Sequence, residues 1–221
     1  MAPTRRRSRA SSCATCRPCR FAIGRGAHLH SNWRTPEMRL DQPRVEPLDA
    51  AQQSAEAQEL TASMAENMRS LNIMRTLAQH PQLMRRWMVF ANHILGKSTL
   101  PVRERELLIL RIGYLCQSGY EWGQHVLIAR QAGMTDAEIR ACQTGSATPG
   151  LAELDRLLFQ ATEELHEDAH VSDATWAGLA QHLNTQQLMD VVFTVGQYNL
   201  VSMALNSFGV QPDEGLPGWE I

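Results

Sequence analysis

The chain has 221 residues and a mass of 24.8 kDa, which suits one domain, since domains typically hold about 100–200 residues. Hydrophobic residues make up 43% of the chain and charged residues 20%, the balance of an ordinary globular protein. The net charge of -2 excludes a protein that binds nucleic acid by bulk electrostatic attraction, because such a protein needs a basic surface to release counterions from phosphates.

The charge is distributed unevenly along the chain. Residues 1–36 carry eight arginines and no acidic residue, whereas the remainder carries 13 Lys and Arg against 23 Asp and Glu. We therefore divide the chain into a basic leader, residues 1–37, and an acidic helical domain, residues 38–221. The leader lacks the apolar run of a secretory signal. Three interpretations of it stay open: a disordered segment upstream of a true start at Met38, an organellar targeting peptide, or a functional arm.

The leader also contains three closely spaced cysteines, Cys13, Cys16 and Cys19, followed by His28 and His30. Cysteine thiolates at this spacing can share a zinc ion. However, no second cysteine pair follows at the distance of a zinc finger or ribbon, so we expect no metal site. The chain has five cysteines, an odd number, and shows no disulfide framework. A reducing cytoplasm is therefore the expected location.

The domain reads as a succession of helices, and no segment has the alternation of a strand. In chain order, the expected helices cover residues 49–69, 71–79, 83–95, 103–117, 118–133, 135–145, 150–167, 172–183 and 185–208. The predicted fold class is all-α.

Two of these helices are unusually apolar. The helix over 103–117 is apolar on almost every side, which predicts a buried position at the centre of the fold. The helix over 185–208 is long and apolar, but Asp190, Gln197 and Asn199 argue against a membrane span.

The residues best suited to chemistry are Glu106, Glu121 and His125. Glu121 and His125 are four residues apart and therefore share one face of a helix. A carboxylate at that distance can raise the pKa of the imidazole and fix its tautomer, which makes a candidate general acid/base pair. Glu106 lies on the buried helix before them, where its charge requires a partner. The candidate partners are His125, Arg103 and Arg111.

A structural interpretation of the same residues stays open. Ser118 and Glu121 match the capping-box pattern, in which a serine and a glutamate three residues later satisfy the first backbone groups of a helix. Thr135 and Glu138 match the same pattern at the next helix. In this interpretation His125 is a hydrogen-bonded core residue without a catalytic role.

Three segments resemble the carboxymuconolactone decarboxylase family: RERELLILR at 103–111, YEWGQH at 120–125 and ARQAG at 129–133. The resemblance spans roughly residues 45–210. It implies an all-helical fold related to alkylhydroperoxidase D, and a homo-oligomer in which apolar helices pack across subunits. The apolar helix over 185–208 agrees with that expectation.

The alkylhydroperoxidase branch of this family carries a Glu, a Cys-x-x-Cys pair and a His at fixed spacing. Its Glu and His fall on Glu106 and His125, but its two cysteines fall on Ser118 and Glu121. Without those thiols the disulfide cycle of that branch cannot operate. We interpret the nearby Cys116 as a packing residue, because an apolar environment raises the pKa of a thiol.

The decarboxylase branch carries Glu-Trp-x-x-His, as this chain does, and implies a reaction without a cofactor on a small carboxylated lactone. In that reaction carbon dioxide is lost and the enzyme protonates carbon. The resemblance predicts His125 as the general acid/base, Glu121 as the residue that orients it and Glu106 as the second carboxylate.

The predicted substrate contacts are Arg105, Arg111, Trp122 and Ser118. Either arginine could pair with the substrate carboxylate, because a guanidinium matches a carboxylate bidentately. Trp122 could form a pocket wall, although a tryptophan beside an apolar helix face is more often a core residue.

Three functions stay open at this point. The first is an acid/base lyase that acts on a small lactone or organic acid, the second is a thiol peroxidase of the peroxiredoxin type, and the third is a non-catalytic helical oligomer that binds a small molecule. Dependence on a thiol separates the first two, and a shifted pKa of His125 separates the first from the third. We expect a small-molecule substrate, no cofactor or metal, and neither a nucleic acid nor a membrane as partner.

Overall fold

The computed structural model describes residues 38–221, so the predictions for the leader and its cysteines and histidines lie outside the described residues. The described residues belong to one compact unit. Its helices are α1 (Ala55–Ala62), α2 (Glu66–Arg69), α3 (Asn72–Leu77), α4 (Pro81–Gly96), α5 (Val102–Leu115), α6 (Gly119–Gln131), α7 (Asp136–Thr144), α8 (Glu153–Asp168), α9 (Asp173–Leu179) and α10 (Thr185–Phe208). The described part of the chain contains no strand, and the all-α prediction is confirmed there.

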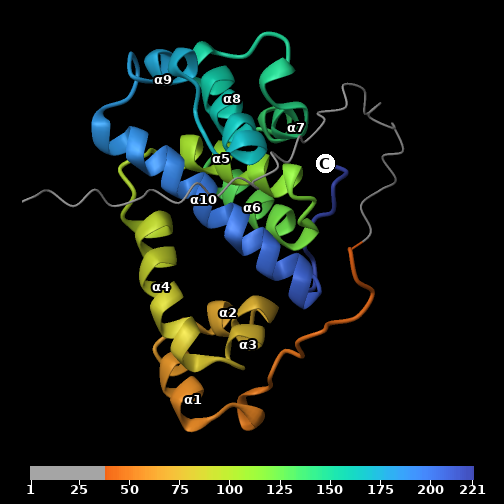
Figure 1. The fold of residues 1–221 in the computed structure, drawn as a ribbon. Coiled ribbons are helices and arrows are strands. Elements are labelled where there is room, and N and C mark those ends of the chain that lie inside the picture. Colours follow the sequence, from red (N-terminus) through yellow and green to blue (C-terminus); the bar gives the residue numbers. More distant parts are fainter. Residues whose placement is uncertain (1–37) are drawn as a thin grey trace, which may run out of the picture. The chain divides into compact units, whose positions relative to one another are not determined.

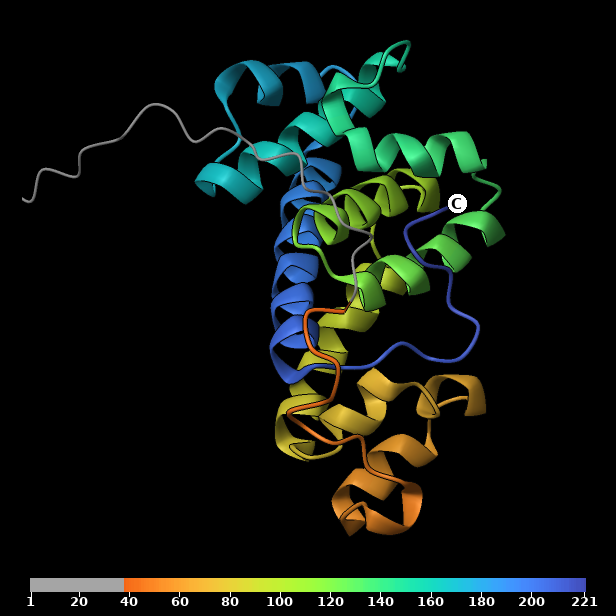
Figure 2. The same cartoon turned by 90° about the vertical axis from the view of Figure 1, so that its right-hand side faces the viewer.

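Helix α5 lies at the centre of the fold and packs against α6, α7, α8 and α10 (Figure 1). Every residue from Arg105 to Gly113 is buried. The predicted central position of this helix is therefore confirmed. Helix α10 runs the length of the bundle beside α5 and α6, as Figure 2 shows.

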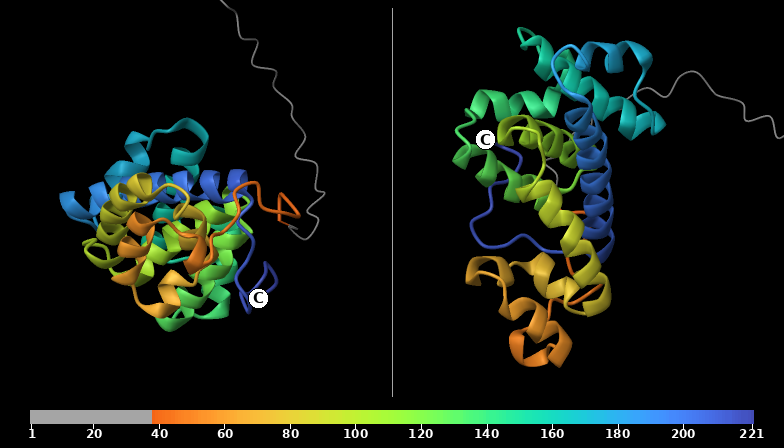
Figure 3. Two further views of the ribbon diagram at one scale, coloured as in Figure 1. Left: turned by 90° about the horizontal axis from the view of Figure 1, so that it is seen from below. Right: turned by 90° about the vertical axis from the view of Figure 1, so that its left-hand side faces the viewer.

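The predicted single helix over residues 49–69 is wrong, because the chain breaks it twice. Ser54 has an extended backbone, and its hydroxyl accepts a hydrogen bond from the backbone N–H of Ala57 at 3.2 Å, so it caps the start of α1. Ser63 ends that helix. The segment folds as a short 3₁₀ helix (Ala50–Gln52) followed by α1 and α2 at one end of the domain, and α4 leads back from this end to α10 (Figures 1 and 3).

The two capping-box predictions have different outcomes. At α7 the box is present: Thr135 Oγ1 accepts from the backbone N–H of Glu138 at 3.3 Å, and Glu138 Oε2 accepts from the backbone N–H of Thr135 at 2.8 Å. At α6 it is absent, since within the described residues the Ser118 side chain makes no capping hydrogen bond. The carboxylate of Glu121 turns instead toward His125.

Helix α10 has the length and composition of a membrane span, yet half of its most apolar window is buried inside the fold. Such burial is typical of a core helix in a globular protein. Its exposed side carries Met189, Phe193, Leu200 and Met203, each more than half exposed. Their spacing of four, seven and three residues places them in one stripe along the helix.

We predict that this stripe forms a contact between two copies of the chain. Replacing Phe193 by Glu should shift the protein toward a monomer, because the substitution brings a charge into an apolar contact. Light scattering after size exclusion measures the change. The same substitution at Leu127, an exposed leucine of α6, is the control and should leave the mass unchanged. A wild-type chain that is already monomeric would contradict the prediction.

Candidate functional site

Four charged side chains from α5 and α6 form a continuous row, which we call the charge row: Arg105, Glu106, His125 and Glu121. Arg105 donates hydrogen bonds from Nη2 and Nε to Glu106 Oε1 at 3.1 and 3.2 Å. Glu106 Oε2 lies 2.6 Å from His125 Nδ1, and His125 Nε2 lies 3.1 Å from Glu121 Oε1. All four residues are buried, with between 0% and 7% of each exposed.

Close packing of α5 and α6 brings these side chains together. Gly113 lies two helical turns after Glu106 and therefore faces the same neighbour. A Cβ atom at Gly113 would lie 3.3 Å from Cγ of Glu121, so the glycine leaves room for that side chain. Glu121 and His125, one turn apart on α6, then meet the face of α5 that carries Glu106.

The row keeps His125 protonated. Burial opposes the positive charge of the ring, but the charges of Glu106 and Glu121 outweigh it and raise the pKa of His125 from 6.5 to about 10. The imidazolium thus places a positive charge between two carboxylates at neutral pH. Charges alternate along the row and sum to zero, which is the condition for burying several ions together.

Glu121 and His125 line a cavity of about 130 Å³ between α3, α4, α6 and α10. The other polar residues of its wall are Tyr120, Gln124, Gln197 and Tyr198, and the rest of the lining is apolar. The ring of Tyr198 packs edge-on against the ring of His125, with 4.8 Å between their centroids. The row therefore ends at a cavity large enough for a small organic molecule.

The sequence analysis did not identify Tyr198, Gln197 or Gln124 as site residues. Tyr198 and Gln197 lie on α10, more than 70 residues after His125, and no spacing rule connects them to it. The signal that could have found Gln124 was its place between Glu121 and His125 on α6.

The structure places Arg105 behind Glu106, away from the cavity. Its guanidinium holds Glu106 and also donates to the carbonyl oxygen of Leu95 at 2.7 Å. Arg105 therefore fixes and balances the buried carboxylate, which is a different position from the substrate contact that we predicted. Arg103, the other arginine near Glu106 in sequence, pairs with Asp155 and Glu138.

The structure does not bring Arg111 to the site. Its Nη2 lies 2.8 Å from Glu163 Oε1, and its Nη1 donates to the carbonyl oxygens of Cys142 and Gln143 at 3.1 and 2.7 Å. The guanidinium thus joins α5 to α8 and to the end of α7. Gly145 lies against this pair with a φ of +76° and a ψ of -145°.

Gly145→Ala should lower the free energy of unfolding by about 3 kcal/mol, because this backbone region is nearly restricted to glycine. A Cβ atom there would also collide with Arg111 and Glu163. Gly150 is a matched control, since its φ is also +76° and no described atom lies within 4 Å of an added Cβ. We expect Gly150→Ala to cost only about 1 kcal/mol. Equal losses in urea unfolding would contradict the steric argument.

Trp122 and Ser118 do not line the cavity. The buried indole of Trp122 donates from Nε1 to the carbonyl oxygen of Gly218 at 3.0 Å and stacks on Trp219 with 5.2 Å between centroids. It is a core residue that anchors the C-terminal segment. Ser118 is buried at the start of α6, and within residues 38–221 its hydroxyl has no hydrogen-bond partner.

Both cysteines of the described domain are free thiols outside the cavity lining. Cys116 is partly buried and its thiol donates to Asn199 Oδ1 at 3.1 Å. Burial raises the pKa of Cys116 to about 11, and it raises the pKa of the fully buried Cys142 as well. Thiols with such pKa values are largely protonated at neutral pH and react slowly. Within the described domain, no group of three or more His, Cys, Asp and Glu side chains is arranged to hold a metal ion.

Solved structures of known proteins share the fold of this chain, and a family model matches one part of its sequence. Residues 81–164 match the model of the carboxymuconolactone decarboxylase family. No curated protein matches the chain. Among solved structures, an uncharacterised peroxidase-related protein from Silicibacter sp. TM1040 has a TM-score of 0.66 at 17% identity, covering 85% of this chain and 97% of that chain.

Two further structures share the fold. The alkylhydroperoxidase AhpD core of an uncharacterised peroxidase-related protein from Ralstonia eutropha JMP134 has a TM-score of 0.68 at 16% identity, covering 78% of this chain and 93% of that chain. The debrominase Bmp8 has a TM-score of 0.63 at 14% identity, covering 77% of this chain and 92% of that chain. At these identities the likeness shows the AhpD-like helical fold, which agrees with the sequence prediction.

Proposed function

We propose that this chain is an enzyme that transfers protons to and from a small molecule in the cavity, since residues 81–164 match the model of the carboxymuconolactone decarboxylase family. The observation that carries the proposal is the charge row, which ends at a carboxylate on the cavity wall. A positioned acid or base of this kind accelerates proton transfer by about 10²- to 10⁴-fold.

Glu121 exchanges the proton with the substrate in this proposal, and His125 acts through it. Both ring nitrogens of His125 face carboxylates, so the ring holds the carboxylate of Glu121 in place at the cavity wall. A substrate with an acidic C–H next to a carbonyl gives that proton to Glu121. Protonated Glu121 then returns it to another carbon of the same molecule. This exchanges the roles of Glu121 and His125 that the sequence predicted.

Decarboxylation of a small carboxylated lactone is the specific form of the proposal that the family name suggests. Carbon dioxide leaves, and its bonding electrons pass into the conjugated lactone. Glu121 takes the Nε2 proton of His125 and passes it to the carbon, and a proton from water then restores the imidazolium. The described lining contains no Lys or Arg, so His125 is the positive charge nearest to a substrate carboxylate. Neutral lactones and enols, which need no cationic partner in the cavity, are therefore candidate substrates as well.

A thiol peroxidase is the second candidate, because two solved structures with this fold are described as peroxidase-related. Two observations oppose it. Glu121 occupies the place of a cysteine of the alkylhydroperoxidase branch, and the pKa of the Cys116 thiol is raised to about 11.

The cysteines of the described residues are free thiols, which agrees with a reducing compartment. We therefore propose a cytoplasmic location.

Thiol dependence separates the two candidates. Reduction of an alkyl hydroperoxide with a dithiol donor is compared between the wild type and Cys116→Ser, in parallel with deuterium uptake from D₂O into a set of lactones. We expect the two proteins to show equal background peroxide reduction and equal deuterium uptake. Peroxide reduction that is lost with Cys116 would overturn the proton-transfer proposal. A protein that binds the lactones without exchange would be a binding protein.

A further inference from the structure

We infer that the substrate of this site carries a hydrocarbon group, which lies in a second, apolar cavity formed by α3, α4 and α10. This inference rests on the proposed function, since it describes the substrate of the same site. We call the second space the tail cavity.

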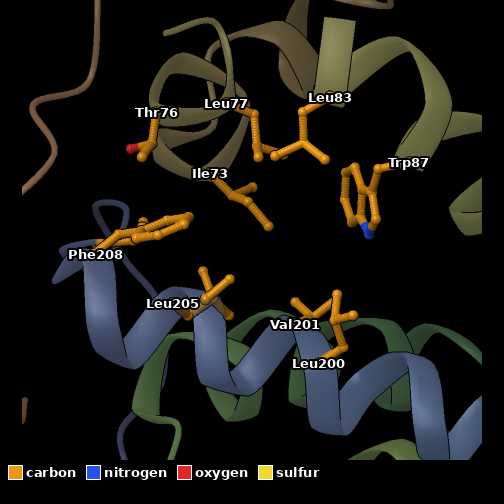
Figure 4. A pocket seen from close by; sticks show the side chains of 11 residues that line it. Ile73, Thr76, Leu77, Leu83, Trp87, Leu200, Val201, Leu205 and Phe208 are labelled. Carbon is orange, nitrogen blue, oxygen red and sulfur yellow. The ribbon is translucent and has the colours of Figure 1, made fainter. Parts of the chain in front are cut away.

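The tail cavity has a volume of about 90 Å³ and an almost wholly apolar wall. Ten of its eleven lining residues are apolar, and the eleventh is Thr76. Figure 4 shows Leu77 and Leu83 on one side of the space and Leu205 on the other. A water molecule in such a space finds few hydrogen-bond partners, whereas an apolar group fits it well. The wall therefore favours a hydrocarbon over a polar ligand.

The tail cavity adjoins the cavity that holds Glu121 and His125. Ile73, Trp87 and Val201 line both spaces. In Figure 4 the indole of Trp87 extends from α4 toward Val201 on α10. A molecule whose polar end lies at Glu121 can extend between these side chains into the tail cavity.

The charged groups are confined to one end of this combined space. Glu121 and His125 line the first cavity but not the tail cavity. The arrangement matches an amphipathic molecule with a carbonyl or lactone group at one end and an alkyl or aryl group at the other. It would discriminate against a compact, highly oxygenated acid, because such a molecule would leave the tail cavity empty.

Binding of a homologous series tests the inference on the whole protein. The probes are γ-lactones whose alkyl side chain grows from methyl to octyl, and the dissociation constant is measured by calorimetry and by tryptophan fluorescence. We expect each added methylene to tighten binding by about fourfold until the tail cavity is filled. A dissociation constant that stays the same across the series would overturn the inference.

A variant that fills the tail cavity gives a second test. Ala204 lines the tail cavity and not the first cavity, so Ala204→Phe should abolish the dependence on chain length and leave binding of the methyl lactone unchanged. Ala137→Phe, on the exposed face of α7, is the matched control and should behave as the wild type. Chain-length dependence that persists in a folded Ala204→Phe protein would also overturn the inference.

The binding series separates this inference from the proposed function. If binding tightens with chain length and no lactone exchanges a proton, the tail cavity is supported and the proposed function fails. If exchange requires Glu121 but neither Kd nor KM changes with chain length, the proposed function stands and the tail cavity is overturned.

Discussion

Replacing Glu121 by glutamine should lower kcat by about 10²- to 10⁴-fold while the chain stays folded. Glutamine has nearly the same shape and can still contact His125 Nε2, which lies 3.1 Å from Glu121 Oε1. It cannot accept and return a proton, so the step that we assign to this residue is lost. KM should change little, because the volume of the cavity stays the same. The measurement is the rate of deuterium uptake or of carbon dioxide release with the best lactone found.

Glu104→Gln is the matched control for that variant. Glu104 is a glutamate of α5 that does not line the cavity. Its Oε1 atom lies 4.0 Å from Nη1 of Arg103. We expect its kcat to equal that of the wild type. A Glu121→Gln protein with full activity would place the chemistry elsewhere, and a His125→Gln protein would then show whether the imidazole acts without Glu121.

The contact among Glu106, Glu121 and His125 was predictable because it depends on local rules. One rule is that residues four apart share a helix face. The other is that a carboxylate on a buried helix needs a partner. Which carboxylate faces the cavity was not predictable, because it depends on how α3, α4 and α10 pack against α6. The sequence therefore predicted that these three side chains meet, whereas the roles that we propose for Glu121 and His125 depend on the cavity and differ from the predicted ones.

The partner of Glu106 shows a second limit of sequence reasoning. Arg105 is the adjacent residue, and neighbours on a helix point in directions about 100° apart, so such pairs are not expected to meet. The long arginine side chain folds back to reach the carboxylate. Arg111 is six residues further along α5, which places it about 120° around the helix from Arg105, toward α7 and α8. Two arginines that looked equivalent in sequence thus serve different contacts.

The error at residues 49–69 has a purely local origin. Alanine, glutamine and glutamate favour a helix along that segment, but a serine can cap a new helix or end an old one through its own hydroxyl. Ser54 does the first, and Ser63 marks the end of α1. The break matters for function, because the short helices that follow bring Ile73 to the wall of both cavities.

Replacing Glu106 by glutamine should destabilise the protein by about 3–5 kcal/mol at neutral pH, because it leaves buried charges without their partner. It should also lower the pKa of His125 from about 10 toward 6.5, since one of the two carboxylates that raise it is removed. Urea unfolding measures the first effect, and NMR titration of the imidazole measures the second.

The dependence of stability on pH gives the sharper test of the Glu106→Gln variant. In the wild type the folded state holds the proton of His125 more tightly than the unfolded state. Its contribution is therefore complete below pH 6.5 and is lost as pH rises through about 10. Across that window the free energy of unfolding should fall by roughly 1 kcal/mol per pH unit. Glu106→Gln should flatten this slope, because the pKa of His125 then lies closer to its value in the unfolded chain. Glu163→Gln removes the carboxylate that pairs with Arg111 instead, and it should reduce stability while leaving the slope intact. A slope that is the same in Glu106→Gln and in the wild type would show that the charge row does not hold the proton on His125.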